Sequence, residues 1–229
     1  MIGKQPIKTV DAIISVFYKD LKIIKERYNL ESKLTAHISN GVDIFRYKRN
    51  DKIERRYITL LATRLSYIKG VDIFLEIAKK LFDKDNSLEF LIVGEGPLKR
   101  MVQDAQKKLP IKLIASYPYE KIQEIYNQSR VLLIISRTEG VPNVIYEGFT
   151  CVTPIVSSNV SGISNIITHN ENGLLYDISK YHNAVDLVLD LINNNERCTR
   201  LGKNARLLIE KQYSWDAITE RVYEFYKNF

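Results

Sequence analysis

The chain has 229 residues, of which 45% are hydrophobic, and a net charge of +7 at neutral pH. This length and composition suit one large α/β domain with a small appendage and exclude a disordered chain. No apolar run is long enough to span a bilayer, and neither a signal peptide nor a metal-ligand spacing of cysteine or histidine is present, so we expect a cytoplasmic protein without a metal site.

The positive charge favours anionic partners. No known nucleic-acid-binding motif accompanies the basic residues, so we expect no nucleic-acid partner. Nucleotides and an acidic membrane surface remain as candidate partners. The membrane surface is a candidate because lysines and arginines are dense at 46–56. Peripheral contact with the inner face of a membrane is therefore an open alternative to a simple solvated linker.

Residues 1–50 do not follow the pattern of the rest of the chain. An apolar, strand-like start and a helix are predicted within 10–30, and a second strand within 34–47 contains an Asn-Gly turn. We interpret 1–50 as the tail of another domain with a linker, and 51–229 as the main domain.

From residue 57 onward, predicted strands and helices alternate. Compact apolar runs predict strands at 57–63, 88–93, 111–115, 130–135, 154–158 and 173–176. Apolar residues at helical spacing, or helix-start signals, predict helices from about 71, from Pro97, and at 120–128, 142–150, 164–168, 180–193, 196–212 and 215–226. This alternation predicts an α/β fold with a Rossmann-like, doubly wound parallel sheet, which binds ligands at the carboxyl ends of its strands.

The stretch EGVPNVIYE, at 139–147, directly follows the fourth predicted strand. Pro142 suits the first helical position, and the free amides at such a helix start attract phosphate or sugar oxygens. Glu147, more than a turn into the helix, is placed to accept two hydrogen bonds from a vicinal diol such as a ribose. Glu139 stands closer to whatever is held in front of the helix. By spacing alone, both glutamates could equally be solvated surface residues.

Several motifs follow one another in a familiar order. They are SNGVD (39–43), RLSYIKG (64–70), IVGEGP (92–97), EGVPNVIYE (139–147), TPIVSS (153–158), NGLLYD (172–177) and YSW (213–215). In this succession the chain resembles the retaining glycosyltransferases of family four, which have the GT-B fold. The resemblance covers nearly the whole chain and implies the C-terminal, donor-binding half of such an enzyme, preceded by the last strand and helix of its N-terminal acceptor domain. Val152 stands where the family commonly has a glycine.

The resemblance implies a role for each candidate residue. Arg64 and Lys69 hold the diphosphate of a nucleotide-sugar donor and stabilise the charge of the leaving group, so that no metal or other cofactor is needed. Glu139 lies near the donor sugar and completes the catalytic candidates, while Glu147 binds the ribose. The other donor-binding candidates belong to the helix start or to a glycine pair after the second predicted strand: Gly140, Val141, Pro142, Asn143, Val144, Gly94 and Gly96.

We therefore expect a glycosyltransferase that passes a sugar from a nucleotide-diphosphate sugar to a glycan or lipid-linked acceptor, with retention. The glycine-rich loop and other groups of an acceptor domain are absent, so the chain supplies only the donor side, and a separate acceptor-domain chain is a possible partner. Two alternatives stay open. One is a non-catalytic nucleotide-sugar-binding module or truncated remnant, and the other is a sugar-nucleotide epimerase.

Overall fold

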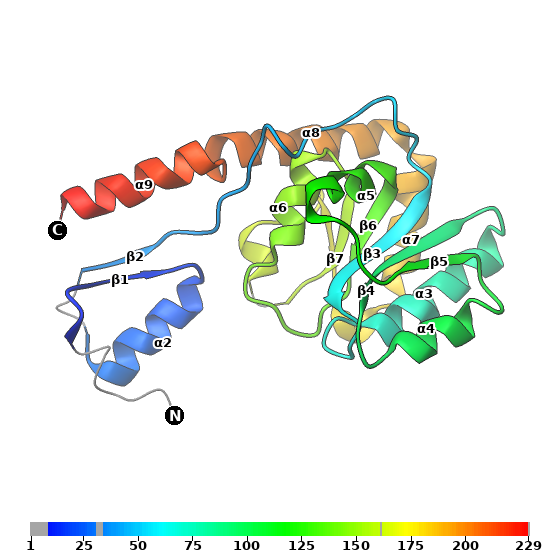
Figure 1. Ribbon diagram of the computed structural model, residues 1–229, viewed down its shortest axis with the longest axis horizontal. Helices are drawn as coiled ribbons and strands as arrows, with labels where there is room; N and C mark the ends of the chain where they lie inside the picture. Colours follow the sequence, from blue (N-terminus) through cyan, green and yellow to red (C-terminus); the bar gives the residue numbers. More distant parts are fainter. Residues whose placement is uncertain (1–8, 31–33, 161, 229) are drawn as a thin grey trace.

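The computed structural model describes residues 9–30, 34–160 and 162–228, which form a small and a large body joined by an extended linker (Figure 1). The small body contains β1 (Ala12–Ser15) and β2 (Leu34–His37), which pair in parallel, and α2 (Tyr18–Tyr28). The large body holds the sheet predicted from the alternating pattern. Among the described residues, no helix has both the length and the apolar character needed to cross a membrane.

The large body contains six parallel strands in the order β5-β4-β3-β6-β7-β8. Their bounds are β3 (Tyr57–Arg64), β4 (Glu89–Glu95), β5 (Ile111–Ile114), β6 (Ser129–Ile134), β7 (Ile155–Ser158) and β8 (Leu174–Tyr176). The Rossmann-like α/β fold is thereby confirmed. After β5 the chain crosses to the other side of β3 and continues in the opposite direction. In open parallel sheets, ligands bind where the strand order reverses in this way, here between β3 and β6.

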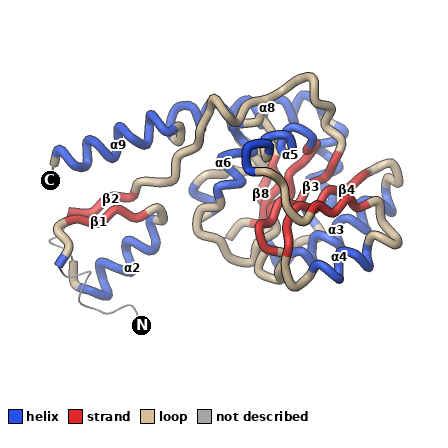
Figure 2. The backbone as a smooth tube through the Cα atoms, in the orientation of Figure 1, coloured by secondary structure: helices blue, strands red, loops and turns tan. Residues whose placement is uncertain are grey.

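Helices cover both faces of the sheet (Figure 2). They are α3 (Val71–Lys84), α4 (Lys99–Ala105), α5 (Gln123–Gln128), α6 (Asn143–Thr150), α7 (Asn183–Asn193) and α8 (Asn195–Gln212), while α9 (Trp215–Lys227) follows α8 and extends away from the sheet (Figure 1). Successive residues of a strand point to opposite faces of the sheet. In β6, for example, Leu133 belongs to the same apolar cluster as Phe74 of α3, whereas Leu132 belongs to the cluster of Phe149 of α6. The apolar core is therefore divided between the two sides of the sheet.

Three predicted helix starts or lengths were wrong. Pro142 precedes α6 in an extended conformation, with ψ 123°, because the proline ring fixes φ but leaves ψ free. The helix expected from Pro97 begins two residues later, since the Leu98 amide donates to the Leu65 carbonyl, 3.1 Å away, across the neighbouring loop. Of the helix predicted at 164–168, only the 3₁₀ turn η2 (Ile163–Asn165) forms.

Two further segments contain 3₁₀ turns ahead of their helices. The predicted helix at 120–128 divides into η1 (Tyr119–Lys121) and α5, and the one at 180–193 follows η3 (Ile178–Lys180). Neither difference changes which side of the sheet the segment covers. The start and type of a short helical turn depend on local hydrogen bonds, which periodicity does not report.

The turn after α6 keeps an unusual backbone conformation. Val152 has φ 57°, in the left-handed region that glycine adopts readily and a β-branched residue rarely does. Its carbonyl accepts a hydrogen bond of 2.7 Å from the Arg55 guanidinium. The valine therefore occupies the conformation expected of the family's glycine, and the surrounding contacts hold it there.

The second half of the linker is fixed to the large body. Asn127 of α5, only 1% exposed, accepts a hydrogen bond from the Asn50 amide at 2.7 Å and donates to the Lys48 carbonyl at 2.9 Å. Val42 forms a parallel bridge with Ser214, just before α9. Figure 1 shows α9 extending from the large body toward the side on which the small body lies. The assignment of 1–50 to the end of an acceptor domain stays a prediction.

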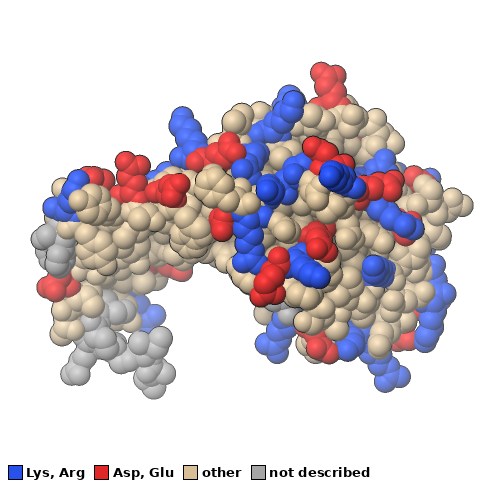
Figure 3. All heavy atoms as spheres, turned by 45° about the horizontal axis from the view of Figure 1, so that its top comes forward, with Lys and Arg blue, Asp and Glu red and all other residues tan. Residues whose placement is uncertain are grey.

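Charged side chains are mixed on the surface that Figure 3 shows. Lysines and arginines are spread over the large body, with aspartates and glutamates among them. A field of a single sign attracts an anionic surface most strongly, and neighbouring acidic groups weaken it. The arrangement therefore does not strengthen the expectation of a membrane contact.

Candidate functional site

A cavity of about 450 Å³ opens where the strand order reverses. Its floor is formed by the carboxyl-terminal parts of β3 and β6, and its walls by the segment before α5, the loop after β6 and the start of α6. Most of the lining is apolar, with a few polar groups that converge from different elements. The volume and composition are typical of sites for small molecules.

Lys69 and Glu139 form an ion pair inside this cavity. The Lys69 ammonium donates to Oε1 of Glu139, and the Ser136 hydroxyl donates to the same oxygen at 2.6 Å. The side chains of Lys69 and Glu139 are only 29% and 13% exposed. The loop after β6 thus supplies a carboxylate held by two donors, and the loop after β3 supplies a cation that an incoming anion could share. This pairing was not predicted from the sequence.

Glu147 also lines the cavity, and buried tyrosines surround its carboxylate. The fully buried Tyr126 donates its hydroxyl hydrogen to the Glu147 carboxylate. Burial raises the pKa of Glu147, and the hydrogen bond from Tyr126 and the charge of Arg46 oppose that rise. Burial and the negative charge of Glu147 raise the pKa of Tyr47, whose hydroxyl has no hydrogen-bond partner among the described residues.

The start of α6 faces the cavity through Pro142, Asn143 and Val144. The first amides of a helix have no acceptor within the helix and lie at the positive end of its dipole. The Asn143 side chain is held by a 2.9 Å hydrogen bond from Asn40 of the linker. Gly140 and Val141 precede this start and do not line the cavity.

Other predicted residues lie outside the cavity. Arg64 ends β3 with an exposed side chain that has no hydrogen bond or ion pair within the described ranges. Gly94 and Gly96 have φ 144° and 157°, and a Cβ on Gly94 would overlap the carbonyl oxygen of Ala62. A Cβ on Gly96 would lie 2.6 Å from the Leu65 carbonyl oxygen. These glycines allow the end of β4 to pass close to β3, so packing alone explains them.

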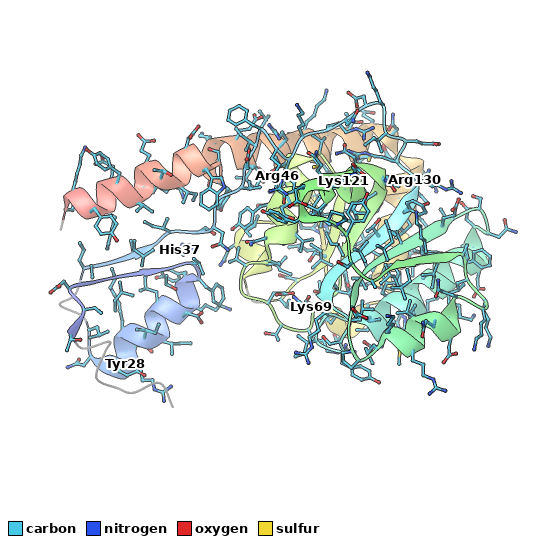
Figure 4. The ribbon with its side chains drawn as sticks, viewed as in Figure 1. Tyr28, His37, Arg46, Lys69, Lys121 and Arg130 are labelled. Carbon is cyan, nitrogen blue, oxygen red and sulfur yellow. The ribbon has the colours of Figure 1, made fainter. Side chains whose placement is uncertain are left out.

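Sequence reasoning missed an aromatic wall. Tyr119 lines the cavity, and the Arg46 guanidinium lies 3.8 Å above its ring and donates to its carbonyl oxygen. Arg46 comes from the linker, and Figure 4 places it above α6 and Lys69 below α6 in that view. A smaller cavity of about 250 Å³ adjoins the first through shared residues, including Glu147. The dense basic segment at 46–56 was the available signal, but its sequence does not reveal which arginine turns inward.

Comparison with known proteins identifies the family of this chain. The model described as "Glycosyl transferases group 1" matches residues 43–208. An uncharacterized glycosyltransferase of Methanocaldococcus jannaschii is 28% identical over 162 residues, covering 69% of this chain and 44% of that protein. A poly(ribitol-phosphate) alpha-N-acetylglucosaminyltransferase of Staphylococcus aureus is 26% identical over 205 residues, covering 86% and 40%. The chain thus spans less than half the length of these two relatives.

Solved structures share the fold. A point mutant of S. aureus TarM, in a complex with fondaparinux, alpha-GlcNAc-glycerol and UDP, superposes with a TM-score of 0.83 at 23% identity, covering 97% of this chain and 45% of that one. Anabaena Alr3699/HepE, with UDP and glucose, gives a TM-score of 0.81 at 16% identity, covering 97% and 64%.

Proposed function

This chain belongs to the group 1 glycosyl transferases, and we propose that it is the donor-binding half of a retaining, family-four enzyme. The observation that carries the proposal is the convergence of Lys69, Glu139, Glu147 and the start of α6 on one cavity at the reversal of strand order. A cation, two carboxylates and free helix amides match the phosphates and hydroxyls of a nucleotide sugar.

We propose the following arrangement of the donor. The ribose hydroxyls bind Glu147, the diphosphate binds Lys69 and the start of α6, and the sugar lies beside Glu139. When the bond between the sugar and the diphosphate breaks, negative charge develops on the departing phosphate oxygen. A fixed ammonium and the positive end of a helix dipole stabilise that charge more than they stabilise the intact donor. Arg64 joins them only if its exposed side chain turns toward the phosphates.

The transfer step is proposed to proceed with retention and without a protein nucleophile. The acceptor hydroxyl oxygen bonds to the anomeric carbon on the face that the diphosphate leaves, and the hydroxyl proton passes to the departing diphosphate oxygen. The Lys69 ammonium supplies the charge that a metal ion would otherwise supply. In this proposal, the donor-free pairing of Lys69 with Glu139 is exchanged for pairing with the diphosphate.

The acceptor side is proposed from the relatives. One curated relative is named for transfer to poly(ribitol-phosphate), and another is a capsular polysaccharide biosynthesis glycosyltransferase of S. aureus. We therefore propose a glycan or lipid-linked acceptor, held by a domain that continues the small body or comes from a separate chain. If the acceptor is lipid-linked, the proposal includes peripheral contact of the protein with the membrane that holds this lipid.

Titration calorimetry tests the donor half of the proposal. UDP and a panel of UDP-, ADP- and GDP-sugars should include at least one ligand, and Lys69→Ala and Glu147→Ala should each weaken its binding about 10- to 100-fold. The matched control is Lys107→Ala, because this exposed lysine of the surface after α4 pairs only locally with Asp104. A folded wild-type chain that binds no member of the panel would refute the proposal.

Product analysis separates the alternatives. Slow hydrolysis of the donor, or transfer restored by an added acceptor domain, supports an enzyme half. Donor binding with neither reaction supports a non-catalytic binding module. Product formed from the donor alone, with one sugar carbon inverted, supports an epimerase.

A further inference from the structure

One arginine joins the loop after β6 to the loop after β3 and, through Asp72, to the first turn of α3 that follows this loop. The two guanidinium nitrogens of Arg137 donate to the two carboxylate oxygens of Asp72, at 2.9 and 2.6 Å. The same side chain donates to the Tyr67 carbonyl, and the Arg137 backbone amide donates to the Ile68 carbonyl at 2.8 Å. Four hydrogen bonds thus connect one residue to a short segment about 65 positions earlier in the chain.

This connection is close in sequence to both partners of the Lys69–Glu139 ion pair. Lys69 belongs to the segment that Arg137 holds, and Glu139 follows Arg137 by two residues. The crossing is also tight, because a Cβ on Gly70, at φ 67°, would overlap the Ile135 carbonyl oxygen. The two loops are therefore hydrogen-bonded and closely packed against each other.

Arg137 does not itself line the cavity. Its guanidinium is committed to Asp72 and Tyr67 on the outer side of the loops, so any effect on a ligand passes through Lys69. A bidentate arginine–carboxylate pair fixes an angle as well as a distance, which a lysine does not do. Burial tends to raise the pKa of Asp72, but the hydrogen bond and charge of Arg137 outweigh it and leave that pKa below its ordinary value. The carboxylate therefore stays ionised at neutral pH.

We propose that Arg137 is a positioning residue for the donor diphosphate: its bidentate pair with Asp72 holds the Lys69 loop against the Glu139 loop, so that the Lys69 ammonium faces the cavity. This inference rests on the proposed function. Without the pair, the loop after β3 remains tethered by its backbone, but the direction of Lys69 is no longer set. A shift of about 1 Å in such a group is enough to reduce its effect up to about 100-fold.

The experiment compares a nucleoside diphosphate with its nucleoside. Calorimetry measures the affinities for UDP and uridine, and likewise for the ADP/adenosine and GDP/guanosine pairs, in the wild type, Arg137→Ala and Asp72→Asn. We expect the ratio of diphosphate affinity to nucleoside affinity to fall about 10- to 100-fold in both variants, as in Lys69→Ala. Nucleoside affinity should be unchanged because Glu147 and Tyr126 are untouched. The double variant Lys69→Ala/Arg137→Ala should lose no more than Lys69→Ala alone.

Three comparisons separate positioning from general stability. Arg137→Lys keeps the charge without the fork and should restore only part of the ratio, whereas the exchange Arg137→Asp/Asp72→Arg should restore more. Arg197→Ala breaks a comparable ion pair with Asp190 on α7, remote from the cavity, and should leave the ratio unchanged. If Arg137→Ala does not fold, Asp72→Asn and Arg137→Lys decide.

The outcomes are distinct. A wild type that binds UDP, together with folded Arg137→Ala and Asp72→Asn variants that keep its affinity ratio, would overturn the positioning role while leaving the proposed function intact. A wild type that binds no diphosphate would overturn both.

Discussion

Glu147 is a charged residue of the cavity whose ionised form is disfavoured by burial. Lys69 and Glu139 neutralise each other, whereas Glu147 has a hydrogen bond from Tyr126 and no salt bridge among the described residues. Burial disfavours its charged form, and its pKa is raised. A carboxylate kept in an unfavourable place is common at binding sites, because it is held ready for a ligand's hydroxyls.

Replacing Glu147 by glutamine should therefore stabilise the protein at neutral pH. Because the folded-state pKa is above the unfolded value, ionisation of Glu147 lowers stability as pH rises through the folded pKa, and this loss is absent below the unfolded pKa. The amide oxygen of glutamine still accepts from Tyr126. We expect Glu147→Gln to raise Tm at pH 7 by about 2–4 °C for each kcal/mol relieved, and this gain should vanish near pH 4.

Differential scanning calorimetry across this pH range provides the measurement. The exposed Glu171→Gln serves as control and should change Tm at neither pH. A Glu147→Gln variant less stable than wild type at pH 7 would contradict the assigned cause of the raised pKa. Its donor affinity should fall even as its Tm rises.

At the scale of elements, the glycine pair at the end of β4 illustrates how one motif is compatible with two roles. A GxG pattern between a strand and a helix is compatible with a phosphate loop, and the sequence left that possibility open. In the structure, the pair accommodates the end of β3, because the carbonyl of Ala62 and the backbone of Leu65 occupy the space of the missing side chains. Gly140 differs from them, since a Cβ there would meet no atom within 4 Å.

Gly94→Ala and Gly140→Ala should therefore have opposite consequences for stability. Gly94→Ala combines a positive φ with an overlap that only a shift of β3 relieves, so we expect a loss of about 2–5 kcal/mol in the free energy of unfolding. Gly140→Ala should stay within about 0.5 kcal/mol of wild type. Urea denaturation followed by circular dichroism measures both, and similar values for the two variants would show that the β3–β4 crossing is more adaptable than its geometry indicates.

At the scale of the whole molecule, the linker decides whether its residues reach the cavity. Arg206 of α8 donates to the carbonyls of Ile44, at 3.1 Å, and Tyr47, at 3.0 Å, in the linker, and to the carbonyl of Thr150 at the end of α6, at 2.7 Å. One side chain thus fastens the linker to the large body beside Glu147. This attachment helps to place Arg46 and Tyr47 at the smaller, adjoining cavity.

Arg206→Met, which keeps the apolar stem, should release the linker. Three partly buried carbonyls lose a charged donor, so we expect a loss of about 2–4 kcal/mol in the free energy of unfolding. The control is Glu210→Gln, which removes only the ion pair of Arg206 with a 42% exposed side chain and should change stability by less than about 1 kcal/mol. Chemical denaturation of both variants provides the measurement, and an equal effect in both would mean that the ion pair, not the linker, is what Arg206 stabilises.

Local patterns in the sequence were enough for most of the fold. Apolar runs and helical spacing predicted all six strands of the large sheet and the α-helices between them, except that only a 3₁₀ turn forms between β7 and β8. Burial on one or two faces imposes a period that survives in the sequence. The same reasoning located Glu139 after a strand and Glu147 within a helix. The resemblance implied Lys69 and Arg64, and the roles of all these residues remain predictions.

Tertiary structure alone decided which side chains meet. Tyr126 is 21 positions from Glu147, and Arg137 is 65 positions from Asp72, separations without any period that would reveal the contact. The order β5-β4-β3-β6-β7-β8 brings the loops after β3 and β6 together. Arg64 is exposed outside the cavity, whereas Lys69 lines it, a difference that the sequence did not reveal. Hydrophobic periodicity determines which face of each helix or strand is buried. Which side chains of different elements meet depends on the order of the elements across the sheet, and this order is a property of the folded chain.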